Sequence, residues 1–419
     1  MGQTLEKPNT EKYNESNVGP GIRYGLASMQ GFRMSMEDNH SVVIGIPELG
    51  EHVSWFSVFD GHNGSKVSAY CSSHLLESIV SVDEFKHTVI KENKLPHDKF
   101  KKKIESSLVT GFLKLDKKLL KAPEVLSTTG YVVGGTTAIG VIISEKYIIF
   151  SNCGDSRGVL SGKTGAGEEN AISKPTLATI DHKPSNTTEE KRIKKAGGYV
   201  MRDRVNGHLA VSRVFGDFEY KNIKGKDPKK QLVTPEPDIY IQVRQTEIDE
   251  FVVLACDGVW DVMSNEEIVS FVSDRMKVTD DLETICNEVL DTCLHKGSHD
   301  NMSIIIIAFP AAPKIDQEAK TKDEALNTLL EQRVTNIVKE GSSNIPTEYK
   351  IFLENGSLEF NEIFRMLSEE EFSYLPLGGG LHSKKQHMLE TFESLHAKNE
   401  DDPRSTIQSL PDNMNANSS

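Results

Sequence analysis

Three apolar segments that end on an aspartate next to a glycine constrain the fold of this chain more than any other feature. Their sequences are WFSVFDG (55–61), YIIFSNCGD (147–155) and FVVLACDG (251–258). Aromatic and β-branched residues favour strands, and glycine adopts backbone angles that other residues avoid. Each segment therefore predicts a buried strand that stops abruptly and holds a carboxylate at its end.

Helical spacing between these segments indicates a mixed α/β chain. Apolar residues recur at steps of three and four after Gly64, over about 98–121 and over about 281–295. A further apolar strand, MSIIIIAF, follows Asp300. A fourth aspartate is therefore expected at a strand edge.

Three other segments carry weaker signals. Residues 22–46 predict a pair of strands with Gly31 at the turn between them. We interpret residues 80–97 as a connection. Residues 161–178, which are rich in Gly, Ala, Thr and Glu, are interpreted as a surface loop.

Six carboxylates at or near the expected strand ends indicate a metal site. They are Glu37, Asp38, Asp60, Asp155, Asp257 and Asp300. Each alone could be a helix cap or a turn residue, but clustered carboxylates raise one another's pKa unless a cation lies among them. All candidate ligands are oxygens, which favours Mg²⁺ or Mn²⁺ over Zn²⁺ or copper. Two such ions that share a bridging carboxylate can activate a water molecule as hydroxide near neutral pH.

Composition argues against several classes of protein. The formal net charge of −14 disfavours a nucleic-acid-binding protein, which would present a basic face. The five cysteines form no CxxC pair, so reduced thiols in the cytoplasm or nucleus are expected rather than a zinc knuckle or disulfides. The sequence contains no run of 18 apolar residues, so no transmembrane helix is predicted. Gly2 is compatible with N-myristoylation and membrane association, although Glu6 lies where Ser or Thr is preferred.

Nine features in a fixed order resemble the metal-dependent Ser/Thr protein phosphatases, the type 2C or PPM family. They are Arg33, MEDNH (36–40), FDGHNG (59–64), GGTTA (134–138), NCGDSR (152–157), DHKPSN (181–186), LAVSRVFGD (209–217), LACDGVWDV (254–262) and HDNMSII (299–305). The similarity runs from about residue 22 to 309. The opening MGQTLEKP and residues 321–395 are similar to the start and the helical C-terminal extension of the family's alpha/beta subgroup.

The resemblance implies an α/β fold in four layers, an α-β-β-α sandwich of two antiparallel sheets flanked by helices. The acids would line a cleft at one end of the sheets. The expected divisions are a flexible N-terminal arm (1–21), a metal-dependent phosphatase catalytic domain (22–312), a helical C-terminal extension (313–395) and a disordered tail (396–419).

The resemblance also assigns roles to the individual carboxylates around two metal ions and a third, weaker one. The implied ligands are Asp60 as the bridge, the Gly61 carbonyl at one metal, Asp257 and Asp300 at the other, Glu37 and Asp38 largely through water, and Asp155 together with Asp257 at the third. All of these ligands are oxygen atoms, which suits a hard cation such as Mg²⁺ or Mn²⁺.

Two further residues match the family's phosphate-binding arginine and its proposed general acid. Arg33 would hold the phosphate in a bidentate arrangement for which Lys is a poor substitute. His62 would protonate the leaving group, because a serine or threonine alkoxide leaves poorly without a proton. Gly216-Asp217 is also shared with the family, and we interpret it as a structural turn because no catalytic role follows from the residues.

These roles imply hydrolysis of phosphoserine and phosphothreonine on proteins by metal-activated hydroxide, without a covalent phospho-enzyme. Phosphorylated proteins would be the substrates, and a monomer is the default state. Two alternatives remain: a catalytically silent relative that binds phosphoproteins in the same cleft, and a two-metal nuclease or phosphodiesterase. The complete set of matched residues argues against the first, and the acidic charge balance argues against the second.

Overall fold

The computed structural model describes residues 4–164, 172–340, 360–377 and 379–400 of the chain. The chain divides into two compact units, Met1–Ile315 and Asp316–Ser419, and each is described by itself. Within the described residues, no helix combines the length and the apolar character that crossing a lipid bilayer would require.

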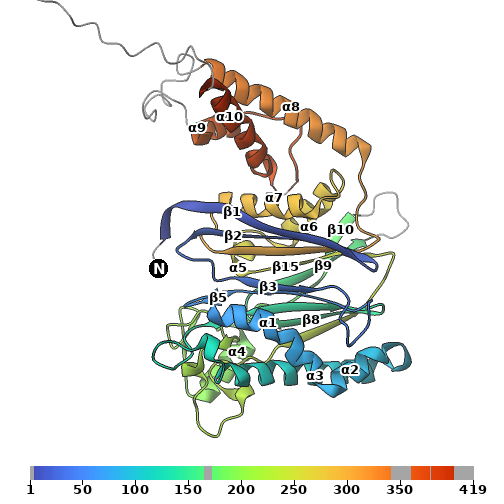
Figure 1. The fold of residues 1–419 in the computed structure, drawn as a ribbon, viewed down its shortest axis with the longest axis vertical. Coiled ribbons are helices and arrows are strands. Elements are labelled where there is room, and N and C mark those ends of the chain that lie inside the picture. Colours follow the sequence, from blue (N-terminus) through green and yellow to red (C-terminus); the bar gives the residue numbers. More distant parts are fainter. Residues whose placement is uncertain (1–3, 165–171, 341–359, 378, 401–419) are drawn as a thin grey trace, which may run out of the picture. The chain divides into compact units, whose positions relative to one another are not determined.

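A six-stranded antiparallel sheet forms one half of the first unit (Figure 1). In spatial order its strands are β1 (Thr4–Gly19), β2 (Ile22–Arg33), β16 (Met302–Ala308), β15 (Asp249–Ala255), β9 (Arg157–Thr164) and β10 (Ile172–Ala178). Helices α6 (Asn265–Met276) and α7 (Leu282–His295) cover its outer face. A capping box between Ser264 and Glu267 begins α6.

A five-stranded antiparallel sheet forms the other half. Its strands, in spatial order, are β14 (Asp238–Val243), β8 (Tyr147–Cys153), β7 (Ala138–Ile143), β4 (Ser54–Phe59) and β3 (Asn39–Val43). Its outer face is covered by α1 (Lys66–Val80), α2 (Asp83–Ile90) and α3 (His97–Leu119). The expected helices over 98–121 and 281–295 are thus present as α3 and α7.

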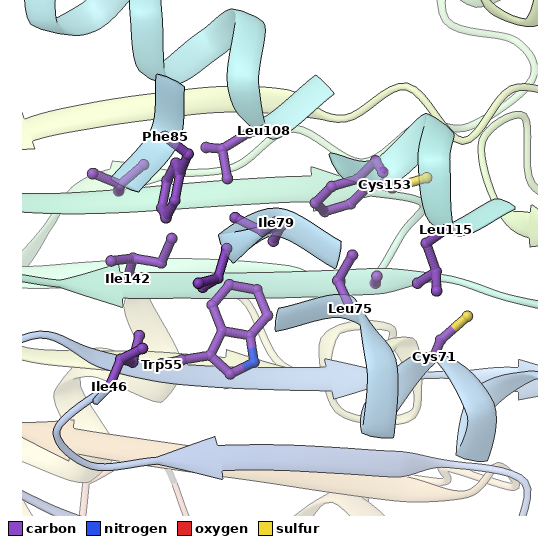
Figure 2. Close-up of a cluster of buried hydrophobic side chains, with 14 of the residues drawn as sticks. Ile46, Trp55, Cys71, Leu75, Ile79, Phe85, Leu108, Leu115, Ile142 and Cys153 are labelled. Carbon is purple, nitrogen blue, oxygen red and sulfur yellow. The ribbon is translucent and has the colours of Figure 1, made fainter. Parts of the chain in front are cut away.

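The indole of Trp55 lies at the centre of the core between this second sheet and its helices. It is fully buried near Leu75, Ile79 and Ile142 (Figure 2). Gly140 on the neighbouring strand makes room for the ring, because a Cβ atom at this position would clash with it. Removing a buried aromatic side chain of this size typically costs about 3–5 kcal/mol of stability.

A third core lies between the two sheets and completes the four layers. Trp55 and Phe59 of β4 face the helices, whereas Phe56 and Val58 face the opposite sheet. Both faces of the strand are therefore buried, which explains why its sequence lacks alternating polar residues. The four-layer α-β-β-α fold expected from the sequence is confirmed.

A small three-stranded sheet joins distant parts of the chain at one end of the sandwich. Its strands are β13 (Phe215–Gly216), β6 (Gly135–Thr136) and β5 (Gly61–His62), in that spatial order. The central strand pairs with both others, and Gly135 lies opposite His62 on one side and Gly216 on the other. Residues about 150 positions apart in sequence therefore meet here.

The structure corrects several expectations about local elements. The expected flexible arm (1–21) is wrong for Thr4–Gly19, which form edge strand β1 and pair with β2 along most of their length. Gly31 does not join a strand pair, because β2 and β3 belong to different sheets. The expected connection at 80–97 contains helix α2.

The expected surface loop at 161–178 is also mostly strand. Residues 157–164 form β9 and residues 172–178 form β10, which pair with each other. Residues 165–171, the centre of that prediction, lie outside the described residues.

The second unit is helical and has its own core. It contains α8 (Gln317–Glu340), α9 (Phe360–Ser368) and α10 (Lys385–Glu400), which bury residues that include Leu330, Ile363 and Met388. A buried ion pair joins Lys384 to Asp323 at 2.6 Å, with both side chains less than 5% exposed. The predicted helical C-terminal region is confirmed. Helix α10 extends to Glu400, and residues 401–419 of the predicted tail lie outside the described residues.

Candidate active site

The carboxylates meet because the strands that carry them end at the same edge of the sandwich. Strands β4 and β8 are both antiparallel to β7, so Asp60 and Asp155 follow strand ends on one side of the second sheet. In the first sheet, Ala255 pairs with Ile304, which brings Asp257 close to the start of β16. Packing of the sandwich therefore determines where the acids lie, as the strand-end motifs predicted.

Hydrogen bonds across the two sheets lock these ends together. The Ser303 hydroxyl of β16 donates to the Asp38 carboxylate at 2.8 Å. The backbone N–H of Glu37 donates to the Asn301 side chain at 2.9 Å, and Asn301 in turn donates to the carbonyl of Ser35. The segment before β3 is thereby fastened to the residue that follows Asp300.

Burial and mutual repulsion strongly perturb the central acids. Burial raises the pKa of Asp60 well above its ordinary value, and the charges of Asp257, Asp38, Asp155 and Asp300 raise it further. The pKa of Asp257 is raised in the same way, first by burial and then by Asp155 and Asp300. Repulsion of this kind would be relieved by a cation bound among the carboxylate oxygens.

Asp38 shows the same effect and has the partners to explain it. It is only 7% exposed, and burial raises its pKa to about 7 despite hydrogen bonds from Ser303 and Cys256. Potential ligand atoms of Asp38, Asp60 and Cys256 lie within 4.8 Å of one another. The oxygen atoms of this group are suited to a hard divalent cation.

Gly61 and Glu37 are held against helix α1 at the edge of the cluster. The Ser68 hydroxyl donates to the Glu37 carbonyl at 2.6 Å. Any side chain at Gly61 would collide with that carbonyl and with Ser68, so glycine is required for the close approach. The backbone of Asp60 is fixed on its other side, since its carbonyl accepts from the N–H of Thr137 at 2.9 Å.

Arg33, the last residue of β2, lies at the rim of the cluster. One of its terminal nitrogens contacts the Asp300 carboxylate at 2.5 Å, and half of its side chain is exposed. Burial lowers the pKa of Arg33, but the negative charges of Asp300, Asp257 and Asp60 raise it overall. The guanidinium is therefore permanently charged and accessible at the edge of the acid cluster.

His62 lies next to the cluster and is paired with Asp217. Its Nε2 atom is 2.6 Å from the Asp217 carboxylate, which is only 5% exposed. Burial lowers the pKa of His62, but the hydrogen bond and charge of Asp217, with the charges of Asp155 and Glu37, raise it overall. The imidazole is thus biased toward its protonated, proton-donating form.

Asp155 belongs to the same cluster and contacts a lysine. Its carboxylate is 2.5 Å from Lys183 Nζ, which stands in the DHKPSN segment. Burial lowers the pKa of Lys183, but the charge and hydrogen bond of Asp155, with the charges of Asp257 and Asp261, raise it overall. The structure therefore brings together all nine residues selected from the sequence, with Lys183 and Asp261 beside them.

Three residues that contact the site were not selected from the sequence as site residues. Asp261 follows Asp257 by four residues, and its N–H donates to the Asp257 carbonyl at 2.8 Å, so helical spacing could have placed both on one side of α5 (Asp257–Trp260). Lys183 belongs to the motif DHKPSN (181–186), but nothing in the sequence indicated that this lysine contacts the carboxylates. The third is Asp217, whose contact with His62 spans 155 residues and has no local signature.

The donor set fits a divalent metal. Asp38, Asp60 and Asp257 lie close together, and their raised pKa values express burial and the repulsion that bound cations would remove. Asp38, Asp60, Asp257 and Asp300 would hold such ions. The neighbouring thiol of Cys256 is fully buried and its pKa is raised well above the ordinary value, so it remains a neutral donor rather than a thiolate ligand.

Comparison with known families agrees with this site. Residues 22–302 match the family described as Protein phosphatase 2C, and residues 303–393 match the Protein serine/threonine phosphatase 2C, C-terminal domain. The chain therefore belongs to the protein phosphatase 2C family, and the resemblance inferred from its motifs is confirmed. Members are metal-dependent, and the chain is accordingly an enzyme, a protein serine/threonine phosphatase.

Individual relatives cover almost the whole chain. Protein phosphatase 1B from Bos taurus is 46% identical over 400 residues, which is 94% of this chain and 77% of that protein. Protein phosphatase 1A from Homo sapiens is 44% identical over 406 residues, 97% of this chain and 98% of that protein. The similarity therefore includes the helical second unit as well as the sandwich.

Solved structures show the same fold at lower identity. A phosphatase from Toxoplasma gondii has a TM-score of 0.56 at 24% identity and covers 71% of this chain and 96% of its own. A sex-determining protein from C. elegans has a TM-score of 0.53 at 25% identity and covers 73% and 68%, respectively. Both similarities support the α/β sandwich assigned above.

Proposed function

We propose that this protein hydrolyses phosphoserine and phosphothreonine on proteins with two Mg²⁺ or Mn²⁺ ions, and that a third ion binds more weakly. The observation that carries the proposal is the cluster of Asp38, Asp60 and Asp257, whose pKa values are raised by burial and mutual repulsion, with Asp300 and a half-exposed arginine beside it. Bound divalent ions would supply charge neutralisation and an activated water nucleophile. The remaining tasks fall to side chains of the chain itself.

Arg33 would bind the phosphate. Its planar guanidinium presents paired donors that match two phosphate oxygens, and its position at the rim leaves half of the side chain accessible. Asp300, its present partner, keeps the guanidinium directed at the cluster. The phosphate would thus be oriented with one side toward the acids.

His62 would donate the proton that the leaving group needs. The alkoxide of serine or threonine is a strong base, so its departure requires protonation as the bond to phosphorus breaks. A histidine with a raised pKa beside the cluster can supply this proton near neutral pH. The five buried cysteines take no part as nucleophiles, because burial raises the pKa of each thiol.

The test is phosphate release from a phosphothreonine peptide, with and without Mn²⁺ or Mg²⁺, in wild type and Asp257→Asn. We expect metal-dependent release that the substitution abolishes, because a neutral amide is a far weaker ligand for a hard cation. Glu51→Gln, an exposed carboxylate in a turn, is the matched control and should keep full activity.

Two results would contradict the proposal. Metal binding without phosphate release from any phosphopeptide would favour the catalytically silent phosphoprotein-binding relative. Cleavage of a phosphodiester, such as bis-p-nitrophenyl phosphate, in preference to the phosphopeptide would favour the nuclease or phosphodiesterase alternative.

We further propose a monomer that acts in the cytoplasm or nucleus, with myristoylation of Gly2 as its route to membranes. The divisions at residues 22–312 and 313–395 likewise stay predictions for a catalytic domain and its extension. Light scattering would measure the oligomeric state. Mass spectrometry of the N-terminal peptide from a eukaryotic host would detect the acyl group.

A further inference from the structure

The turn at Gly216-Asp217 has an unusual backbone. Gly216 has φ of +78° and Asp217 has φ of +46°, so two consecutive residues occupy the left-handed region. Glycine adopts this region freely, but a non-glycine residue there needs compensating contacts. The N–H of Asp217 donates to the Gly134 carbonyl at 3.0 Å, and the N–H of Gly216 donates to Asp116 at 2.9 Å.

A purely structural turn would use its aspartate locally, and this one does not. Asp217 stands at the N-cap of a short 3₁₀ turn (Phe218–Tyr220), yet its side chain makes no capping hydrogen bond. Lys221, a nearby cation, pairs with Asp116 at 2.8 Å instead. The Asp217 carboxylate is directed at His62 Nε2, at 2.6 Å.

The small three-stranded sheet creates this approach. Gly135 lies between His62 and Gly216, and a Cβ atom on it would lie 2.8 Å from the Asp217 carboxylate oxygen. The absence of a side chain at Gly135 therefore opens the path between the aspartate and the histidine. Buried Asp116 of α3 fastens the turn from behind, through Gly216 and Lys221.

We infer that Asp217 is a positioning residue for His62 in phosphate monoester hydrolysis. It accepts the hydrogen bond of Nε2–H, which fixes the orientation of the ring and leaves Nδ1 as the nitrogen available to the leaving oxygen. The inference rests on the function proposed above, because it assigns the geometry of the proposed proton donor. It changes the interpretation of Gly216-Asp217 from a structural turn to a part of the active site.

Leaving-group dependence separates this role from a structural one. A phosphothreonine peptide needs its leaving oxygen protonated, whereas p-nitrophenyl phosphate releases a weakly basic phenolate that does not. Loss of a positioned proton donor should therefore slow only the first substrate. A damaged fold or metal site would slow both.

The experiment compares Asp217→Asn with wild type on both substrates, with Mn²⁺ bound. Asparagine tolerates the left-handed backbone but can present its amide N–H to Nε2, which favours the wrong tautomer. We expect kcat for the peptide to fall on the order of 10–100-fold, a fraction of what general acid catalysis typically contributes, with KM little changed. Release from p-nitrophenyl phosphate should change by less than about threefold on the same grounds. Glu219→Gln, an exposed acid two residues away, is the matched control.

A double mutant gives the second criterion. In a His62→Gln background, Asp217→Asn should cause no further loss on the peptide, because residues that act as a unit are not additive. Equal losses on both substrates, or an additive loss in the double mutant, would overturn the inference. If wild type releases phosphate from neither substrate, the proposed function itself fails.

A measurement on the wild-type protein tests the contact between Asp217 and His62 Nε2 without relying on turnover. Nitrogen-15 NMR of histidine-labelled protein, with His62 assigned by its absence in His62→Gln, reports which ring nitrogen carries the proton. The inference requires protonated Nε2 in the wild type. A neutral His62 that is protonated only at Nδ1 would refute it, even if Asp217→Asn failed to fold.

Discussion

Replacing Asp38 with asparagine should stabilise the metal-depleted protein while removing one of its site carboxylates. Burial raises the pKa of Asp38 from an ordinary value of 3.8 to about 7. Its native form therefore holds a proton that the unfolded chain would release at neutral pH. Asparagine keeps an oxygen that can accept from the Ser303 hydroxyl, so the substitution removes the charge and retains the hydrogen bond.

The magnitude follows from the difference between the two pKa values. Each pKa unit corresponds to about 1.4 kcal/mol, so Asp38 costs the metal-depleted protein about 4 kcal/mol at pH 8. At pH 5 more than half of this cost is absent, and about 2 kcal/mol remains. The native state binds more protons than the unfolded state in this window, so stability falls as the pH rises from 3.8 through about 7.

The assay is urea unfolding of both proteins in excess chelator at several pH values. The two tryptophans, Trp55 and Trp260, lie in the first unit, so their fluorescence follows that unit alone. We expect the stability advantage of Asp38→Asn over wild type to grow by about 2–3 kcal/mol between pH 5 and pH 8. Added Mg²⁺ should stabilise wild type more than the variant, because only wild type has the full set of carboxylates.

A constant difference between the two proteins across this pH range would refute the reasoning. Asp38 would then ionise normally in the native state, and its burial would carry no electrostatic cost. A variant that loses stability at every pH would show instead that the carboxylate makes a net favourable contact with Ser303 or Cys256. Asp83→Asn, an exposed acid at the start of α2, is the matched control and should show no such growth.

Two other substitutions test separate parts of the chain. Lys183→Met should increase the affinity of the proposed weakest site for Mn²⁺ on the order of tenfold, because it removes a cation 2.5 Å from Asp155. Electron paramagnetic resonance of free Mn²⁺ would measure this affinity, and an unchanged affinity would contradict the prediction. Lys384→Met should destabilise the second unit by about 3–5 kcal/mol, because it removes the ammonium that faces buried Asp323. Hydrogen exchange of peptides from α8 and α10 would report the loss, and unaltered exchange would refute it.

The sequence predicted those parts of the fold that depend on a buried face. Trp55, Phe56 and Phe59 belong to a strand buried on both sides, so their apolar run was visible without tertiary information. Asp60 and Asp257 come directly after such runs, and their placement follows from the strand ends. The positions of these carboxylates were predictable because core packing determines them.

The parts of the fold that the sequence did not predict lack a periodic pattern of apolar residues. Strand β1 lies at a sheet edge and is mostly exposed, so its residues carry no apolar alternation. An ion pair with Asp291 of α7 holds Lys12 of this strand at 2.8 Å, a contact between residues 279 positions apart. Edge strands of this kind are specified by their neighbours rather than by their own composition.

The Asp217–His62 contact could not be predicted for a related reason. It depends on three two-residue strands and on the missing side chain of Gly135, none of which produces a periodic signal. A family motif marked Gly216-Asp217 as shared, but only the tertiary arrangement shows which atom the carboxylate meets.

The same architecture explains how the fold tolerates a cluster of mutually repelling acids. Asp60 follows a strand with all six residues buried, and its backbone is fixed by Thr137, so it cannot retreat from Asp257 without disrupting the core. The repulsion is therefore carried as lost stability rather than relieved by movement. Cation binding at the proposed site would recover that stability, which would couple metal affinity to core packing beneath the strand ends. A cavity-forming change such as Phe59→Leu should therefore weaken metal binding even where the chain remains folded.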